Sequence, residues 1–156
     1  AMKFIENAEF WIAGDGPRNE EYFRLTESLG LAHKIKFLGK LPPEKLRAIT
    51  PKADVGLSIE ENNGLSYFYS MPNKISDYIQ CRVPVVVSDF PEMRKVVDVF
   101  ECGEKIADYS ELADKVNKVL QNGKLFYKDS LNNAATCLCW EKEEPKILAL
   151  FHKIPS

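Results

Sequence analysis

The sequence has few of the residues that metal and disulfide sites require, and it has no long apolar run. Its 156 residues include four cysteines and two histidines. The cysteines lack zinc-ribbon spacing and the density of a small secreted scaffold, which favours reduced thiols. No apolar run approaches the roughly 20 residues of a bilayer span, and no charged-then-apolar leader precedes the first predicted strand. We therefore expect a cytoplasmic protein without a transmembrane segment, or one that associates peripherally with the inner membrane face.

A strong charge of either sign is also lacking. Lys and Arg number 21 and Asp and Glu number 23, for a net charge of −2, so no whole-protein field attracts nucleic acid or an anionic membrane. Any anion site must be local, and nucleic acid is not an expected partner. The two histidines, His33 and His152, are isolated, and Cys137 and Cys139 would point to different faces of a helix. No metal site is predicted.

The overall composition is that of one globular domain over residues 1–156, with 45% hydrophobic and 28% charged residues. Short apolar runs alternate with helical patterns, which favours an α/β fold: a doubly wound parallel sheet with helices on both faces. The predicted strands cover residues 8–14, 34–39, 53–59, 83–89 and 104–108. The predicted helices cover residues 22–29, 43–49, 72–80, 91–97 and 110–122, followed by a helical tail from residue 124 that restarts at Pro145.

In an open parallel sheet, ligands bind beyond the carboxyl ends of the strands, near helix N-termini. The first such junction reads "GDGPRNEE". Gly14 and Gly16 permit a tight turn, and Pro17 suits the first position of a helix. The turn has neither the G-x-G-x-x-G pattern of dinucleotide folds nor a Walker lysine. It is compatible with an anion site and with a purely structural turn.

The third junction, "EENNGLSYFYSMPNK", is long for a compact α/β domain, and long loops there are usually functional. With Pro72 as the first helical residue, Asn73 and Lys74 lie in the first turn. A lysine fits the helix dipole poorly there unless an anion joins it. Asp77 follows at a spacing that puts it on the same helix face. The pattern indicates a phosphate site, with an ordinary surface ion pair as the alternative.

Four segments carry a family resemblance: "FWIAGDGP", "IKFLGKLPPEKL", "ADVGLSI" and "SMPNKISDYIQCRVPVVVSD". In this order and spacing they resemble the C-terminal, donor-binding domain of retaining group 1 glycosyltransferases with the GT-B fold. The resemblance extends from Ala8 to about Lys153. It implies a Rossmann-like domain that holds a nucleoside-diphosphate sugar as donor substrate. The implied reaction is transfer of the sugar to an acceptor hydroxyl, without a cofactor or a metal.

The resemblance also implies roles for particular residues. The family carries two glutamates separated by seven residues, and the second position falls on Asp77, which would accept hydrogen bonds from the ribose. The first position falls on Tyr69, a departure from the glutamate that contacts the donor sugar. The "PNK" variant would place Asn73 and Lys74 near the diphosphate, and Ser70 would bond near the phosphate or sugar.

The remaining donor-site residues follow the first two strands. The loop after "FLG" often lies near the base of the family's donors, and here it supplies Gly39 and Lys40. The turn of Gly14, Asp15 and Gly16 would flank the crevice on that side.

A second departure concerns what precedes the first strand. The family has an N-terminal acceptor domain, and its donor domain begins with a strand and a loop carrying an Arg and a Lys; neither is present here. Removing that strand from the family's sheet order 3-2-1-4-5-6 leaves 2-1-3-4-5, so a continuous sheet of about five strands is expected. Without its partner domain the chain is expected to have little or no transferase activity, and its sheet could expose apolar surface that drives dimerisation.

Two alternatives remain open. The chain could be a non-catalytic remnant that keeps weak nucleotide affinity, which Tyr69 and the missing basic loop favour. It could also be a receiver-like signalling domain, with Asp15, Ser88 and Lys105 at strand ends, although its third strand ends without an aspartate. The adjacent Glu60 and Glu61 are more typical of solvated residues than of an acid–base pair.

Overall fold

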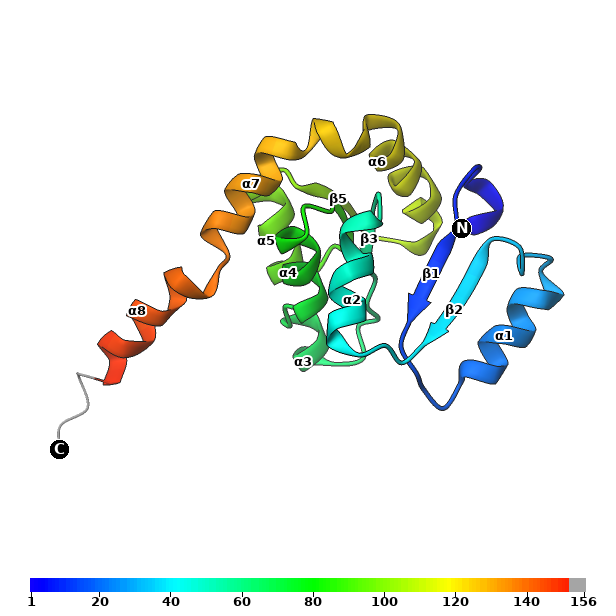
Figure 1. Ribbon diagram of the computed structural model, residues 1–156, viewed down its shortest axis with the longest axis horizontal. Helices are drawn as coiled ribbons and strands as arrows, with labels where there is room; N and C mark the ends of the chain where they lie inside the picture. The colour runs from blue at the N-terminus through cyan, green and yellow to red at the C-terminus, as the bar shows by residue number, and fades with distance from the viewer. Residues whose placement is uncertain (152–156) are drawn as a thin grey trace.

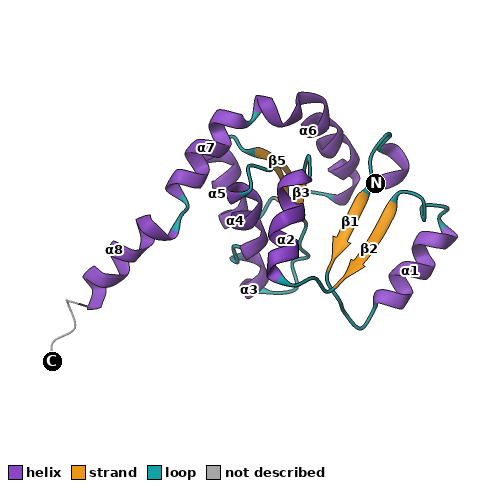
Figure 2. Cartoon of the chain, in the orientation of Figure 1, coloured by secondary structure: helices purple, strands orange, loops and turns teal. Residues whose placement is uncertain are grey.

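The computed structural model describes residues 1–151 and shows an α/β fold with parallel strands (Figures 1 and 2). His152 and Lys153, named above, lie outside the described residues. The strands are β1 (Phe10–Ala13), β2 (Ile35–Gly39), β3 (Gly56–Ser58), β4 (Val85–Ser88) and β5 (Gly103–Ile106). The α-helices are α1 (Asn19–Ser28), α2 (Pro43–Ile49), α3 (Leu65–Phe68), α4 (Asn73–Gln80), α5 (Pro91–Phe100), α6 (Leu112–Phe126), α7 (Lys128–Cys137) and α8 (Trp140–Phe151). Short 3-10 helices cover Met2–Phe4, Thr50–Lys52 and Tyr109–Glu111.

The five strands form two parallel sheets. One pairs β1 with β2, from Phe10 opposite Ile35 to Ala13 opposite Gly39, with a bulge between Ile12 and Ala13. The other has the order β3-β4-β5, with Gly56 opposite Val85 and Val85 opposite Gly103. Figure 1 shows β1, β2 and α1 together at one side of the molecule.

The predicted continuous order 2-1-3-4-5 is therefore wrong at one pairing, because β1 and β3 are not hydrogen-bonded to each other within residues 1–151. The order within each sheet agrees with the prediction, 2-1 in one and 3-4-5 in the other. The physical reason lies in the strand that the family order places between these two. Without it, joining β1 to β3 would require the two halves to close by the width of one strand, about 4.8 Å.

The main core lies around β4, whose four residues are all buried. Because successive side chains of a strand point to opposite faces, both faces of the sheet are covered at this strand. Helix α4 places Ile75 and Ile79 in the core, each fully buried. Gln80 at its end donates to the carbonyls of Ala135 and Leu138, which ties α4 to the end of α7. The core thus positions the beginning of α4 at the carboxyl end of the sheet.

The β1–β2 sheet is less completely covered. Trp11 on β1 is 47% exposed, and Phe23 and Leu25 on α1 are each 52% exposed. Its attachment to the main core runs through the N-terminal segment, where Ile5 is buried and Lys34 Nζ donates to the Ile5 carbonyl at 2.7 Å. The apolar side chains of this sheet and of α1 are thus only partly covered by the described residues.

Three helical details differ from the sequence expectations. Helix α3 lies inside the long junction for which no helix was predicted. Gly123 was expected to end a helix, but it forms a kink with φ 72° inside α6. The tail helix begins at Trp140, before Pro145, so the proline lies inside α8. Among the described residues, no helix combines the length and apolarity needed to cross a bilayer.

Candidate functional site

The turn between β1 and α1 is organised by the side chain of Asp15. Its Oδ1 accepts hydrogen bonds from the Gly16 amide at 2.9 Å and from Asn19 Nδ2 at 2.6 Å. The Gly14 amide donates to the Gly39 carbonyl at 2.9 Å, which joins this turn to the end of β2. Gly39 has φ 65°, a backbone conformation that favours glycine. These contacts hold the loops after β1 and β2 next to each other.

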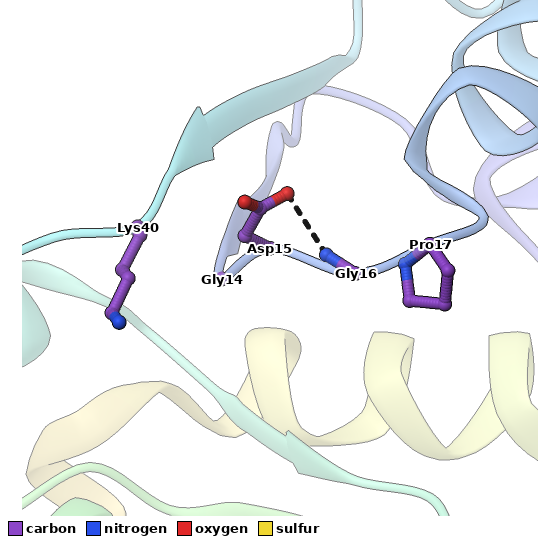
Figure 3. A pocket seen from close by; sticks show the side chains of 5 residues that line it. All are labelled: Gly14, Asp15, Gly16, Pro17 and Lys40. Atoms are coloured by element: carbon purple, nitrogen blue, oxygen red, sulfur yellow. Dashed lines mark hydrogen bonds between the residues drawn. The ribbon is translucent and has the colours of Figure 1, made fainter.

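An open hollow of about 720 Å³ lies over these two loops and is lined by Gly14, Asp15, Gly16, Pro17 and Lys40 (Figure 3). Lys40 extends from the end of β2 on the opposite side of the hollow from Pro17. Four of these five residues, Gly14, Asp15, Gly16 and Lys40, are predicted donor-site residues, and they lie around one hollow. Lys40 is the cation and Asp15 the anion of this lining, and the Gly14 and Gly16 amides already have acceptors, so the hollow has a mixed polar character.

The second group of candidates lies at the beginning of α4. Pro72 occupies the N-cap position, one residue before the helix, and no side chain caps the first turn. The Ile75 amide donates to the Pro72 carbonyl at 3.0 Å. The amides of Asn73 and Lys74, at the first two helical positions, precede any intrahelical acceptor and so favour an anion. Asn73, Lys74 and Asp77 are all exposed, in agreement with their expected position on one face. The beginning of α4 is therefore accessible to a ligand from solvent.

Lys74 already has an anionic partner in this structure. Its Nζ lies 2.7 Å from Oε1 of Glu60, with the lysine side chain 46% and the glutamate side chain 24% exposed. The backbone of Glu60 is held in turn by Ser88, whose Oγ accepts from the Glu60 amide at 2.7 Å and donates to its carbonyl at 3.0 Å. The ends of β3 and β4 thus fix the residue that neutralises Lys74.

Ser70 and Tyr69 precede α4 on the same loop. The Ser70 hydroxyl donates to the Tyr67 carbonyl at 2.9 Å, which leaves both lone pairs of its oxygen able to accept hydrogen bonds. Tyr69 is 59% exposed and packs edge-to-face on Phe68, with ring centroids 5.0 Å apart. The structure gives Tyr69 an aromatic contact in place of the carboxylate that the resemblance implies at this position.

A second cavity of about 320 Å³ lies at the carboxyl ends of β3, β4 and β5, beside the junction that the sequence indicated, but none of the ten predicted donor-site residues lines it. Its lining comprises Glu60, Glu61, Asn62, Asn63, Ser88, Phe90, Ile106, Ala107, Asp108 and Tyr109. Burial raises the pKa of the Tyr109 phenol, and the negative charges of Glu61 and Glu60 raise it further. The run "EENN" was the available signal, since carboxylates and amides after a strand are good partners for hydroxyl groups.

The ten candidate residues therefore fall into two groups. The first hollow is lined by Gly14, Asp15, Gly16 and Lys40, and the carbonyl of Gly39 accepts a hydrogen bond from the Gly14 amide. The other five candidates lie on the α3–α4 loop and on α4, and none of them lines that hollow. They are Tyr69, Ser70, Asn73, Lys74 and Asp77. The division follows the division of the sheet, because one group follows β1 and β2 and the other follows β3.

The residues of the receiver-like alternative are not assembled. Asp15 is bonded within its own turn, Ser88 holds the backbone of Glu60, and Lys105 pairs with Asp98. For the part of the chain that the structure describes, no cluster of three or more His, Cys, Asp or Glu side chains is arranged to hold a metal ion. The four cysteines are free thiols.

Comparison with known proteins identifies the fold and the family. The model of the family described as glycosyl transferases group 1 matches residues 1–122. Among solved structures, a sucrose-phosphate synthase from Thermosynechococcus elongatus superposes with a TM-score of 0.73 at 17% identity, over 92% of this chain and 37% of that one. The glycosyltransferase WaaG superposes with a TM-score of 0.65 at 18% identity, over the same shares of the two chains.

Two curated relatives are also glycosyltransferases. A chitobiosyldiphosphodolichol beta-mannosyltransferase from Dictyostelium discoideum is 27% identical over 136 residues, which cover 87% of this chain and 26% of the relative. The lipopolysaccharide core biosynthesis glycosyltransferase LpsD of Rhizobium meliloti is 44% identical over 39 residues, or 25% of this chain and 11% of the relative. This chain thus matches at most about a quarter of the length of either relative.

The family model matches residues 1–122, and two glycosyltransferase structures superpose on this α/β fold. Both findings agree with the family that the ordered sequence segments resemble. This chain belongs to the group 1 glycosyltransferases, a family with the GT-B fold.

Proposed function

We propose that this chain is the donor-binding domain of a glycosyltransferase that takes a nucleoside-diphosphate sugar and, as part of the complete enzyme, transfers the sugar to an acceptor hydroxyl. The observation that carries the proposal is the uncapped beginning of α4, with Lys74 in its first turn and Asp77 exposed one turn later. A cation and free amides suit a diphosphate, and an exposed carboxylate suits the two hydroxyls of a ribose.

Each candidate has a role in this proposal. Lys74 and the amides of Asn73 and Lys74 hold the diphosphate, and Asp77 accepts hydrogen bonds from the ribose. Ser70 bonds near the phosphate or sugar, and Tyr69 lies on the sugar side. The base lies toward the hollow formed by Gly14, Asp15, Gly16, Gly39 and Lys40.

The expected chemistry is retaining and independent of a metal. The transition state of sugar transfer combines oxocarbenium character with negative charge that develops on the leaving diphosphate. Fixed positive groups and amide dipoles aimed at that charge stabilise it more than they stabilise the bound substrate. An N-terminal acceptor domain completes the enzyme in this proposal, and the chain alone has little or no transferase activity.

The test is a calorimetric panel of UDP, GDP, ADP and their sugars against the wild-type chain, Asp77→Asn and Lys74→Ala. At least one nucleotide is expected to bind, and each variant is expected to bind it more weakly because it loses one charged contact. Glu27→Gln, on exposed α1, is the matched control and should bind as the wild type does. A folded wild-type chain that binds none of these nucleotides contradicts the proposal.

A second candidate function is a non-catalytic nucleotide-binding domain. The ion pair of Lys74 with Glu60 favours it, because the cation that would hold a diphosphate is already neutralised. Reconstitution with an acceptor domain distinguishes the two. Sugar transfer by the pair supports the enzyme, whereas nucleotide binding without transfer supports the remnant. The cytoplasmic location stays a prediction of the sequence.

A further inference from the structure

The cation at the beginning of α4 receives an anionic ligand only in competition with a carboxylate. Glu60 Oε1 lies 2.7 Å from Lys74 Nζ, so a diphosphate that approaches Lys74 meets a like charge, and an exchange of the carboxylate for the diphosphate removes the repulsion. Two bonds with Ser88 Oγ fix the backbone of Glu60 at the end of β3. The exchange is therefore confined to the glutamate side chain, which can turn about its own torsions.

The structure also provides a place for the displaced carboxylate. Glu60 lines the cavity of about 320 Å³ at the carboxyl ends of β3, β4 and β5. The polar and aromatic residues beside it there are Glu61, Asn62, Asn63, Ser88, Phe90, Asp108 and Tyr109. Carboxylate oxygens accept hydrogen bonds, amides both donate and accept, and an aromatic ring offers a flat apolar face. This combination suits the hydroxyl groups and the CH face of a sugar ring.

We propose that Glu60 is a two-position, specificity-determining residue: it neutralises Lys74 in the empty site, and on arrival of the diphosphate it turns into the cavity to accept hydrogen bonds from the hydroxyls of the donor's sugar. The proposal rests on the proposed function. It assigns to Glu60 the carboxylate contact that Tyr69 cannot make, and it explains why the ion pair and the cavity share one residue.

The test uses Glu60→Gln in the 156-residue chain, because this variant keeps the size of the side chain and removes its charge. The nucleoside diphosphate that the wild type binds is expected to bind about two- to fivefold more tightly, since the carboxylate of this partly exposed ion pair no longer competes for Lys74. The added affinity of the nucleotide sugar over that diphosphate is expected to fall about five- to tenfold, because a charged hydrogen-bond acceptor is lost. A merely structural role for Glu60 would not move these two affinities in opposite directions.

Three further variants complete the experiment. Glu27→Gln removes the same charge from the exposed surface of α1, in neither pocket lining, so its affinity for the diphosphate should match that of the wild type. In a double-mutant cycle, Glu60→Gln is expected to give no gain in a Lys74→Ala background. Glu60→Asp retains the charge but is too short to keep the 2.7 Å contact, and it replaces Glu60→Gln should that variant melt below the wild type.

Several outcomes overturn the proposal. Weaker diphosphate binding by Glu60→Gln would show that the glutamate supports the anion site, and an unchanged increment for the sugar would remove it from sugar recognition. A nucleotide sugar that binds no more tightly than its diphosphate refutes the sugar contact while leaving the proposed function intact. Failure of every nucleotide to bind the wild type refutes both.

Discussion

The carbonyl oxygen of Val85 lies against Gly103, its partner across β4 and β5, so closely that a Cβ atom on Gly103 would stand 1.9 Å from it. The two strands meet at this pair because position 103 has no side chain. The contact lies in the sheet whose carboxyl end carries both Lys74 and Glu60, and its loss would disturb the support of the candidate site.

Gly103→Ala is therefore expected to lower the free energy of unfolding by at least about 2 kcal/mol, because the overlap involves backbone that cannot move aside. Urea denaturation followed by circular dichroism measures the change. Gly16→Ala is the control, since an added Cβ there would meet nothing nearer than 4.0 Å, and we expect a change of no more than about 0.5 kcal/mol. Equal stabilities of the two variants would contradict the strand contact.

Glu104 on β5 forms an ion pair with each of two lysines of α6, at 2.5 Å to Lys118 and 3.2 Å to Lys115. Burial raises the pKa of Glu104, but the two lysines outweigh burial and leave its pKa below the ordinary value. Glu104→Gln is expected to lower the free energy of unfolding at pH 7 by about 1 to 2 kcal/mol.

The pH dependence follows from the direction of this shift. A carboxyl group whose pKa is lower in the folded chain stabilises it above the unfolded pKa of about 4.3, and this contribution is lost as the pH falls through the folded value. The difference between wild type and Glu104→Gln should therefore shrink below about pH 4. Glu20→Gln, which removes an exposed pair with Arg24, serves as control and should change stability little.

Cys102 is fully buried, and burial raises the pKa of its thiol to about 11. Because the thiolate is the reactive form, Cys102 is expected to resist iodoacetamide at pH 8 in the folded chain. The exposed Cys137 is expected to be alkylated under the same conditions. Peptide mass spectrometry distinguishes them, and labelling in denaturing urea should modify both. Rapid alkylation of Cys102 without unfolding would show that the core around β5 opens.

The two charged residues of α4 should differ in their response to salt. Diphosphate binding through the exposed Lys74 is a charge interaction in water, so its strength should fall as the ionic strength rises. Lys74→Ala is expected to flatten that dependence, whereas Asp77→Asn should weaken binding while keeping the slope, since ribose hydroxyls are neutral. Calorimetric titrations at several salt concentrations measure both slopes. The same slope in Lys74→Ala and in the wild type would remove Lys74 from the anion site.

Local structure could be predicted from the sequence because it depends on near neighbours along the chain. The β-branched run before Asp89 forms β4, and the spacing of Ile75 and Ile79 places one face of α4 in the core. The exposed Lys74 and Asp77 follow from the same periodicity. The ordered segments were also sufficient to indicate the family, because several junctions had to agree at once.

Only the tertiary structure decided how distant segments pair. The pairing of β1 with β3 depends on two strands that are 43 residues apart in the sequence, from Ala13 to Gly56. A local sequence pattern cannot predict whether they pair. The contact of Glu60 with Lys74 and the cavity shared by the ends of β3, β4 and β5 arise in the same way. A sequence specifies which residues can form strands and helices through short-range sterics, whereas side-chain partners across a sheet are set by packing and by the strands available to fill it.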